Sequence, residues 1–335
     1  MKPIKVAAVQ AAPAFLDLNR SIDKAETLVA EAARNGAKLI AFPETWLPGY
    51  PWFVWLSSPA ESMQYFAGYH QNSMAADSPE MRRLQTMARR HEIFIVMGFS
   101  EREQGSRYMS QAMISDTGDL IQVRRKLKPT FAERMVFGEG DGSDLEVMDT
   151  SIGRVGALNC WEHAQPLVRM AMHAQGEDIH VAAWPSFCLY RDMAHALGPE
   201  VNNSFSRTYA VEGSCYVVAP CATVSQEMFD MMAQTPEKAH LLNPRTSKPG
   251  GGYAMIYAPD GRELCEPLAD DVEGILYADL DPALIDMAKV AADPRGHYSR
   301  PDVLRLVINK EKRRVMSELH HSDVSAVLRP FQEEE

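Results

Sequence analysis

Short apolar runs alternate with amphipathic segments along this 335-residue chain, and the alternation limits the fold more than any other feature. The apolar runs have the length of strands, whereas segments such as Ser21–Arg34 repeat their apolar residues at helical spacing. Gly36 is the expected stop of that helix. Sheets that carry helices on one face and pack together on the other account for such a pattern. The sequence therefore predicts an α/β fold.

The pattern also gives the expected position of each element. Strands are expected at residues 4–10, 38–43, 93–99, 108–115, 120–127, 154–160, 179–183, 215–219, 252–257 and 275–280. Helices are expected at residues 21–34, 78–91, 164–175 and 201–213, and the helix at 164–175 should bury Leu167, Met170, Ala171 and Ala174. Tight turns are expected at Asp116-Thr117-Gly118-Asp119 and at Pro259-Asp260-Gly261. We expect one domain over residues 1–309 and a tail, 310–335, that is exposed or contacts another subunit.

Composition excludes several classes of protein. The net charge of −11 argues against a nucleic-acid-binding face. No apolar run approaches the roughly 20 residues of a membrane span, and the N-terminus resembles a strand rather than a signal peptide. The five cysteines are odd in number and show no close pair, which favours reduced thiols over disulfides or zinc. We therefore expect a cytoplasmic protein that binds neither nucleic acid nor membrane.

Three of the strand-like runs end in a reactive or charged side chain. Glu44 follows the second run, Lys126 and Lys128 end the run at 120–127, and Cys160 ends the run at 154–160. A thiol near a helix N-terminus is favoured as thiolate, although a single cysteine at a strand end is more often a small buried hydrophobe. Alternation does not choose between the lysines, because both point to the same face of a strand.

Together, Glu44, Lys126 and Cys160 resemble the Glu-Lys-Cys triad of the nitrilase superfamily of carbon–nitrogen hydrolases, and the likeness covers nearly the whole chain. The resemblance favours Lys126, which follows Arg125, and leaves Lys128 as the alternative. It also matches Glu133 to the family's second glutamate, which supports the lysine; the alternative for Glu133 is a salt bridge to a nearby arginine. The implied fold is a four-layer α-β-β-α sandwich that assembles at least as a homodimer and extends into spirals.

Several segments resemble the true nitrilases within this superfamily. They are Phe42-Pro43-Glu44, Leu47-Pro48-Gly49-Tyr50-Pro51, Cys160-Trp161-Glu162-His163 and 293–302, and two further segments, 183–190 and 211–221, resemble the arylacetonitrilases. The resemblance implies hydrolysis of an organic nitrile, with an arylacetonitrile preferred, to a carboxylic acid and ammonia. Cys160 would be the nucleophile, Glu44 the general base and Lys126 the cation that stabilises charge on nitrogen. No metal or other cofactor is expected.

The substrate pocket is less defined by the sequence. Candidate pocket residues are Trp55, Trp161, His163, Trp184, Phe187 and Tyr190, any of which could instead belong to the core. The aromatic segment 46–69 is expected to be loop-rich and to form a pocket wall or a subunit contact. Glu162 and His163 also fit a helix cap, and His297 fits a position that organises the site or a subunit contact. Alternative functions are hydrolysis of cyanide, hydrolysis of aliphatic amides, and binding without catalysis.

Overall fold

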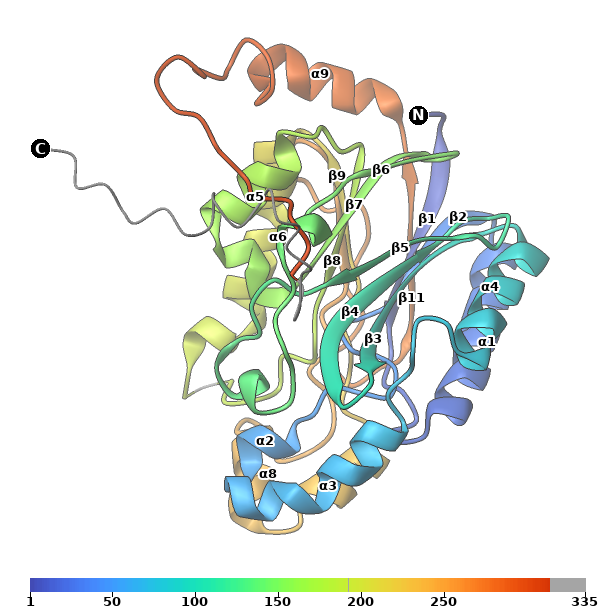
Figure 1. Ribbon diagram of the computed structural model, residues 1–335, viewed down its shortest axis with the longest axis vertical. Coiled ribbons are helices and arrows are strands. Elements are labelled where there is room, and N and C mark those ends of the chain that lie inside the picture. Colours follow the sequence, from blue (N-terminus) through green and yellow to red (C-terminus); the bar gives the residue numbers. More distant parts are fainter. Residues whose placement is uncertain (192, 314–335) are drawn as a thin grey trace, which may run out of the picture.

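The computed structural model describes residues 1–191 and 193–313, and two sheets packed face to face form its centre (Figure 1). One sheet has six strands in the order β11-β1-β2-β3-β4-β5, and the other has five in the order β10-β9-β8-β7-β6. The strands of the first sheet are β1 (Ile4–Gln10), β2 (Ala37–Ala41), β3 (Phe94–Glu103), β4 (Ser106–Ile114), β5 (Leu120–Arg125) and β11 (Gly274–Leu280). Those of the second are β6 (Met148–Thr150), β7 (Gly153–Asn159), β8 (Ile179–Ala183), β9 (Tyr216–Ala219) and β10 (Met255–Tyr257).

Helices cover the outer face of each sheet (Figure 1). Helices α1 (Leu18–Arg34) and α4 (Pro79–His91) pack on the six-stranded sheet, and α5 (Pro166–His173) and α6 (Pro199–Gly213) pack on the five-stranded sheet. The remaining helices are α2 (Phe53–Leu56), α3 (Pro59–Gln71), α7 (Gln226–Met232), α8 (Pro236–Leu242) and α9 (Pro282–Ala292). The predicted four-layer α-β-β-α sandwich is confirmed.

Strands β1, β2 and β3 of the six-stranded sheet are buried on both faces over most of their length, which explains their largely apolar sequences. Val6 and Leu39 point between the sheets and pack with residues of the second sheet such as Val181. Their neighbours Ala7 and Ile40 belong to the cluster beneath α1 and α4. Burial on both faces removes the polar alternation of a half-exposed strand.

Most expected elements are found within a few residues of their predicted bounds. The strands at 4–10 and 179–183 match β1 and β8, and the turn at Asp116–Asp119 joins β4 to β5. Helix α1 begins three residues before its expected start, because Asp17 caps it by accepting from the backbone N–H of Arg20.

The buried face predicted for the helix after Cys160 is wrong at three of its four residues and correct only at Ala171. The chain first forms a 3-10 turn, η3 (Cys160–Ala164), and α5 starts only at Pro166. This later start turns a different face inward: α5 buries Val168, Ala171, Met172 and His173. Leu167 is 69% exposed and Met170 36% exposed, and Ala174 is exposed as well.

The aromatic segment 46–69 is more regular than expected, since it contains α2 and most of α3. Its side chains Trp46, Tyr50, Trp52, Phe53 and Tyr69 are buried. They belong to the tightly packed end of the molecule where α2, α3, α7 and α8 meet, apart from Trp46, which lies beneath α1 and α4. Core packing thus accounts for more of this segment than predicted.

The C-terminal part is described only as far as residue 313. Residues 310–313 are exposed, and the rest of the expected tail, 314–335, lies outside the described residues. His297 lies on an exposed loop after α9. Among residues 1–191 and 193–313, none of the helices is both long and apolar enough to span a membrane.

Candidate active site

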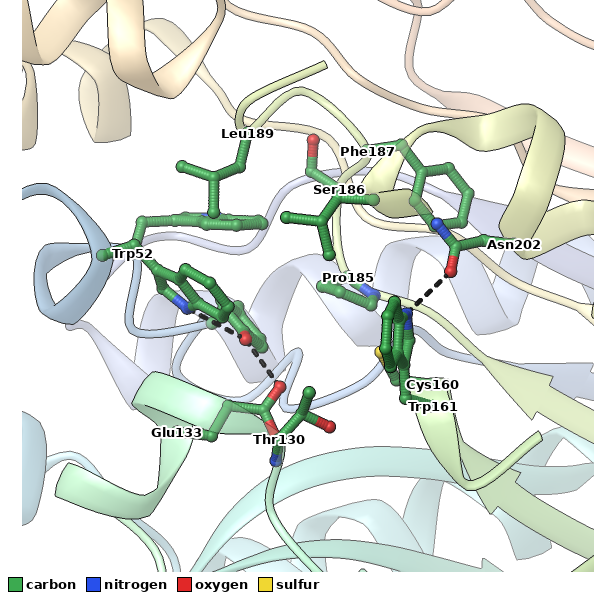
Figure 2. Close-up of a pocket in the computed structure, with 13 residues that line it drawn as sticks. Trp52, Thr130, Glu133, Cys160, Trp161, Pro185, Ser186, Phe187, Leu189 and Asn202 are labelled. Carbon is green, nitrogen blue, oxygen red and sulfur yellow. Dashed lines mark hydrogen bonds between the residues drawn. The ribbon is translucent and has the colours of Figure 1, made fainter. Parts of the chain in front are cut away.

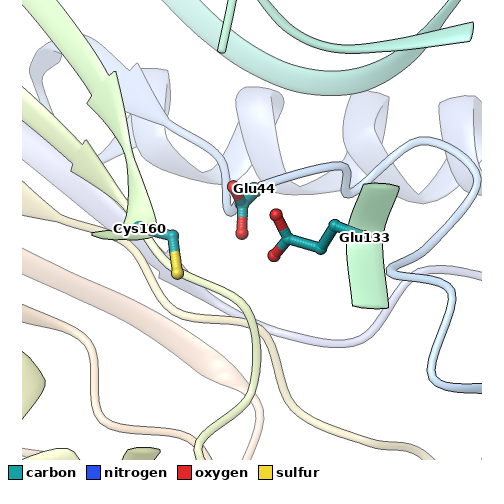
Figure 3. Close-up of side chains that lie close together, drawn as sticks. All are labelled: Glu44, Glu133 and Cys160. Carbon is teal, nitrogen blue, oxygen red and sulfur yellow. The ribbon is translucent and has the colours of Figure 1, made fainter. Parts of the chain in front are cut away.

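The three predicted catalytic segments meet at one end of the two sheets. Glu44 lies shortly after β2, Lys126 directly follows β5, and Cys160 directly follows β7. The Lys126 ammonium donates to Glu44 Oε1 at 2.9 Å and to Glu133 Oε2 at 2.8 Å. Carboxylate oxygens of the two glutamates and the Cys160 sulfur all lie within 4.8 Å of one another (Figure 3). The structure therefore brings together all four residues predicted to carry the chemistry.

Lys126 rather than Lys128 occupies this cluster. Strand β5 ends at Arg125, so the strand alternation that placed both lysines on one face does not reach them. The Lys126 side chain is fully buried, whereas that of Lys128 is half-exposed and pairs with Glu139. Burial between Glu44 and Glu133 therefore distinguishes Lys126 from Lys128.

Glu133 is held from three directions. It lies on a 3-10 turn, η1 (Phe131–Met135), and its Oε2 accepts from the backbone N–H of Thr130 at 2.6 Å as well as from Lys126. The Tyr50 hydroxyl donates to its Oε1 at 2.6 Å. The alternative of a salt bridge to arginine is wrong, because its ionic partner is Lys126.

Glu44 keeps one oxygen available. Its Oε1 accepts from Lys126, but its buried Oε2 has no hydrogen-bond partner among the described residues. Burial raises the pKa of Glu44 to about 8, against the opposing effect of the Lys126 charge. A carboxyl group that can both hold and release a proton near neutral pH is suited to general acid–base chemistry.

Cys160 is a thiol that needs a base. Burial raises its pKa well above the ordinary value, and the Glu44 charge adds to this, while Lys126 acts in the opposite direction. The expectation of a thiolate stabilised by a helix N-terminus is therefore wrong, since α5 begins six residues later, at Pro166. Cys160 also has a φ of +47°, a strained conformation for a residue with a side chain.

Lys126 remains a cation despite its burial. Burial by itself lowers the pKa of an ammonium group, but the adjacent Glu133 and Glu44 outweigh it and raise the pKa well above the ordinary value. The two carboxylates and the sulfur form a set of donors that could hold a metal ion. The Lys126 ammonium group already supplies a positive charge to both carboxylates, in the position where a cation would bind them.

A residue that the sequence suggested only as a helix cap joins the two sheets behind this cluster. Glu162 is buried and receives two hydrogen bonds from Arg124, at 2.7 and 2.9 Å. Its Oε1 also accepts from the backbone N–H of Leu127 at 2.8 Å, and its Oε2 from that of Asn159 at 2.8 Å. Those two backbone groups belong to the residue after Lys126 and the residue before Cys160. Glu162 therefore fixes the strand ends that carry both groups.

A small cavity opens beside the Cys160 sulfur (Figure 2). Its volume is about 40 Å³, and three of the predicted pocket residues, Trp55, Trp161 and Phe187, line it. Tyr50 and Trp52 also line it and come from the aromatic segment 46–69, for which a pocket wall was one of the two expectations. Sequence reasoning missed the remaining lining residues, which are Thr130, Pro185, Ser186, Leu189, Leu197 and Asn202. Asn202 accepts from the Trp161 indole at 3.0 Å and so orients that ring.

The other three predicted pocket residues lie elsewhere. Trp184 and His163 are buried in the core, with their rings stacked on each other, and line neither cavity near Cys160. Tyr190 lines an outer apolar cavity of about 550 Å³ together with Phe131 and Met193. The two cavities share Trp55, Thr130, Trp161 and Leu197, so they lie next to each other.

Residues 5–290 match the family model described as carbon-nitrogen hydrolase. A nitrilase of Pseudomonas syringae pv. syringae is 56% identical over 308 residues, which cover 92% of this chain and 90% of that protein. An aliphatic nitrilase of Rhodococcus rhodochrous is 49% identical, covering 91% of this chain and 82% of that protein. An Alcaligenes faecalis nitrilase named arylacetone-specific is also 49% identical, covering 96% and 89%.

The fold agrees with these matches. The crystal structure of the C. elegans NitFhit protein superposes with a TM-score of 0.70 at 18% identity, covering 94% of this chain and 69% of that one. With the family model spanning most of the chain and curated relatives near half identity, the assignment follows directly. The chain belongs to the carbon–nitrogen hydrolase family and, within it, to the nitrilase branch.

Proposed function

We propose that this protein hydrolyses an organic nitrile to a carboxylic acid and ammonia, with an arylacetonitrile as the preferred substrate. The observation that supports the chemistry best is the placement of one thiol, one ammonium and two carboxylates in a buried cluster. The names of the relatives point to nitriles but leave the substrate class open, because the aliphatic and the arylacetone-specific relatives are equally similar.

The first steps use all of the polar groups in the cluster. Glu44 takes the proton of the Cys160 thiol, and the sulfur adds to the nitrile carbon to form a thioimidate. Glu44 then gives that proton to the nitrile nitrogen, and Lys126 stabilises the negative charge that grows there. Glu133 holds Lys126 in position, since its Oε2 accepts a hydrogen bond from the ammonium group.

The later steps need water. Glu44 activates a water molecule that adds to the thioimidate carbon, and ammonia leaves to give an acyl thioester. A second water molecule cleaves the thioester, releasing the acid and returning the proton to the sulfur. The free Oε2 of Glu44 is the atom available to accept these protons.

The size of the inner cavity argues for a ring separated from the nitrile carbon. A cavity that binds benzene has a volume of about 150 Å³, whereas the cavity beside Cys160 has about 40 Å³. The inner cavity therefore admits the C≡N group and one small carbon, and the ring extends into the outer cavity of about 550 Å³. This arrangement fits an arylacetonitrile better than a benzonitrile, whose ring is attached directly to the nitrile carbon.

We further infer that subunits associate through the outer face of α5 and α6, in a homodimer at least. Leu167 and Met170 of α5 and Val211 of α6 are large apolar residues that are exposed there, around an Arg169–Glu212 ion pair. Exposed apolar groups of this kind mark contact surfaces. A fully active monomer of 37.4 kDa in light scattering would contradict this inference.

Lys126→Ala should lower kcat by about 100-fold or more, because removal of one preorganised donor to a developing charge typically lowers kcat by that factor. Lys128→Ala is the matched control and should retain kcat within about threefold, since its half-exposed side chain lies outside the cluster and pairs with Glu139. Steady-state kinetics with phenylacetonitrile measure both, alongside melting curves to verify folding. A larger loss in Lys128→Ala would show that the assignment of the cation is wrong.

A substrate panel tests the preference itself. Specificity constants should rank phenylacetonitrile above propionitrile by about thirtyfold, the value of burying a ring at roughly 2 kcal/mol. They should also rank phenylacetonitrile above benzonitrile, whose directly attached ring does not fit the inner cavity of about 40 Å³. Cyanide and phenylacetamide are included because the same cluster could act on them. If kcat/KM for cyanide or for phenylacetamide were higher than for phenylacetonitrile, the proposed substrate class would be wrong.

A further inference from the structure

Behind Cys160 runs a buried chain of four polar side chains that the proposed reaction does not use. His163 Nδ1 lies 2.7 Å from the backbone oxygen of Cys160, and His163 Nε2 lies 2.9 Å from His180 Nε2. His180 Nδ1 lies 2.7 Å from Glu177 Oε1, and the Tyr209 hydroxyl donates to Glu177 Oε2. All four side chains are at most 1% exposed.

The backbone oxygen at one end of this chain determines where each proton lies. A carbonyl oxygen only accepts, so His163 must carry its proton on Nδ1. Burial lowers the pKa of His163 well below its ordinary value, so the ring is neutral and its Nε2 accepts. His180 must then donate from Nε2.

The same reasoning extends to the carboxyl group. Burial also lowers the pKa of His180, so with its proton on Nε2 its Nδ1 is an acceptor. Glu177 must therefore donate from Oε1, which requires the protonated acid. Burial raises the pKa of Glu177 to about 7, in the direction that this arrangement needs.

The surrounding structure is shaped to hold this chain. A Cβ atom at Gly156 of β7 would lie 1.7 Å from Glu177 Oε1, so glycine leaves the space that the carboxyl group fills. Tyr209 stacks on the His180 ring with centroids 3.7 Å apart, and Trp184 stacks on His163. A buried polar chain is less favourable than apolar packing unless every member is satisfied, and here each is.

We propose that Glu177 and His180 act as positioning residues that fix the tautomer of His163, which in turn holds the Cys160 carbonyl and keeps the nucleophile in its left-handed backbone conformation. The inference rests on the proposed function only in that Cys160 is the nucleophile. Without the bond to its carbonyl, Cys160 is free to relax from φ +47° and to move its sulfur relative to Glu44.

Two substitutions of His163 separate its two contacts. Asparagine places an amide N–H near the position of Nδ1 and keeps the bond to the Cys160 carbonyl, whereas glutamine reaches His180 and loses that bond. The kcat of His163→Asn should stay within about fivefold of the wild-type value. The kcat of His163→Gln should fall by more than about tenfold while its KM changes by less than about twofold, as expected when a reacting atom is misplaced. Equal losses, or a larger loss in His163→Asn, would overturn the proposal.

A second measurement does not depend on nitrile hydrolysis. The rate at which iodoacetamide alkylates Cys160 can be followed by mass spectrometry of the peptide that contains Cys160. This rate should be higher in His163→Asn than in His163→Gln, the same order as for kcat. If the wild-type protein hydrolysed no nitrile, the proposed function would fail while this ranking still tested the positioning. Similar alkylation rates in the two variants would contradict it.

Glu177→Gln tests the state of the carboxyl group. The amide can donate to His180 and accept from Tyr209, as the protonated acid does, so kcat and the alkylation rate should stay within about threefold of wild type. A loss of more than about tenfold in a variant with an unchanged melting temperature would show that Glu177 does not act as a neutral donor. Retained rates in Glu177→Gln support the role of Glu177 as a neutral donor. Glu177→Leu cannot donate a hydrogen bond, so it should lower both kcat and the alkylation rate.

Discussion

The carboxylate of Glu162 is the interaction on which the geometry of the active site depends. It accepts four hydrogen bonds, two from Arg124 and one from the backbone at each of two strand ends. One of those strands belongs to the six-stranded sheet and the other to the five-stranded sheet. Loss of either partner in a fully buried ion pair costs about 3–5 kcal/mol, because a charge is left uncompensated. The site is thus built across the contact between the sheets rather than on one of them.

Three of the nine non-glycine residues with positive φ among the described residues lie in the same place. Thr45, Phe131 and Cys160 all have positive φ values; Thr45 follows Glu44, Phe131 lies two residues before Glu133, and Cys160 is itself a member of the buried cluster. Each such residue costs on the order of 1–3 kcal/mol and persists only where its surroundings enforce it. Here the enforcement comes from close packing: a Cβ at Gly98 of β3 would lie 2.0 Å from the backbone oxygen of Pro43, directly before Glu44.

Much of the architecture could be predicted from the sequence because its signals are local. Alternating apolar runs located most strands and placed Glu44 and Cys160 at strand ends, but the role predicted for each residue came from the family resemblance. The choice of Lys126 came from resemblance and was accounted for only by the observed end of β5 at Arg125.

The features that sequence reasoning missed all depend on contacts between distant segments. The state of the Cys160 thiol follows from its burial beside Glu44, which no local pattern reports. Trp184 and His163 were predicted to line the pocket because they are close in sequence to residues that do line it, but they stack on each other in the core. Glu162 looked like a helix cap, and its larger contribution appears only when the two sheets are seen together.

The central claim is that Cys160 forms a covalent bond with the nitrile carbon, and the most direct measurement is the mass of the Cys160 peptide during turnover. Rapid acid quenching of a reaction with phenylacetonitrile should trap an adduct of the substrate on that peptide and on no other cysteine. The Cys160→Ala protein should show neither adduct nor turnover at an unchanged melting temperature. Turnover by Cys160→Ala, or an adduct on a different residue, would contradict the account.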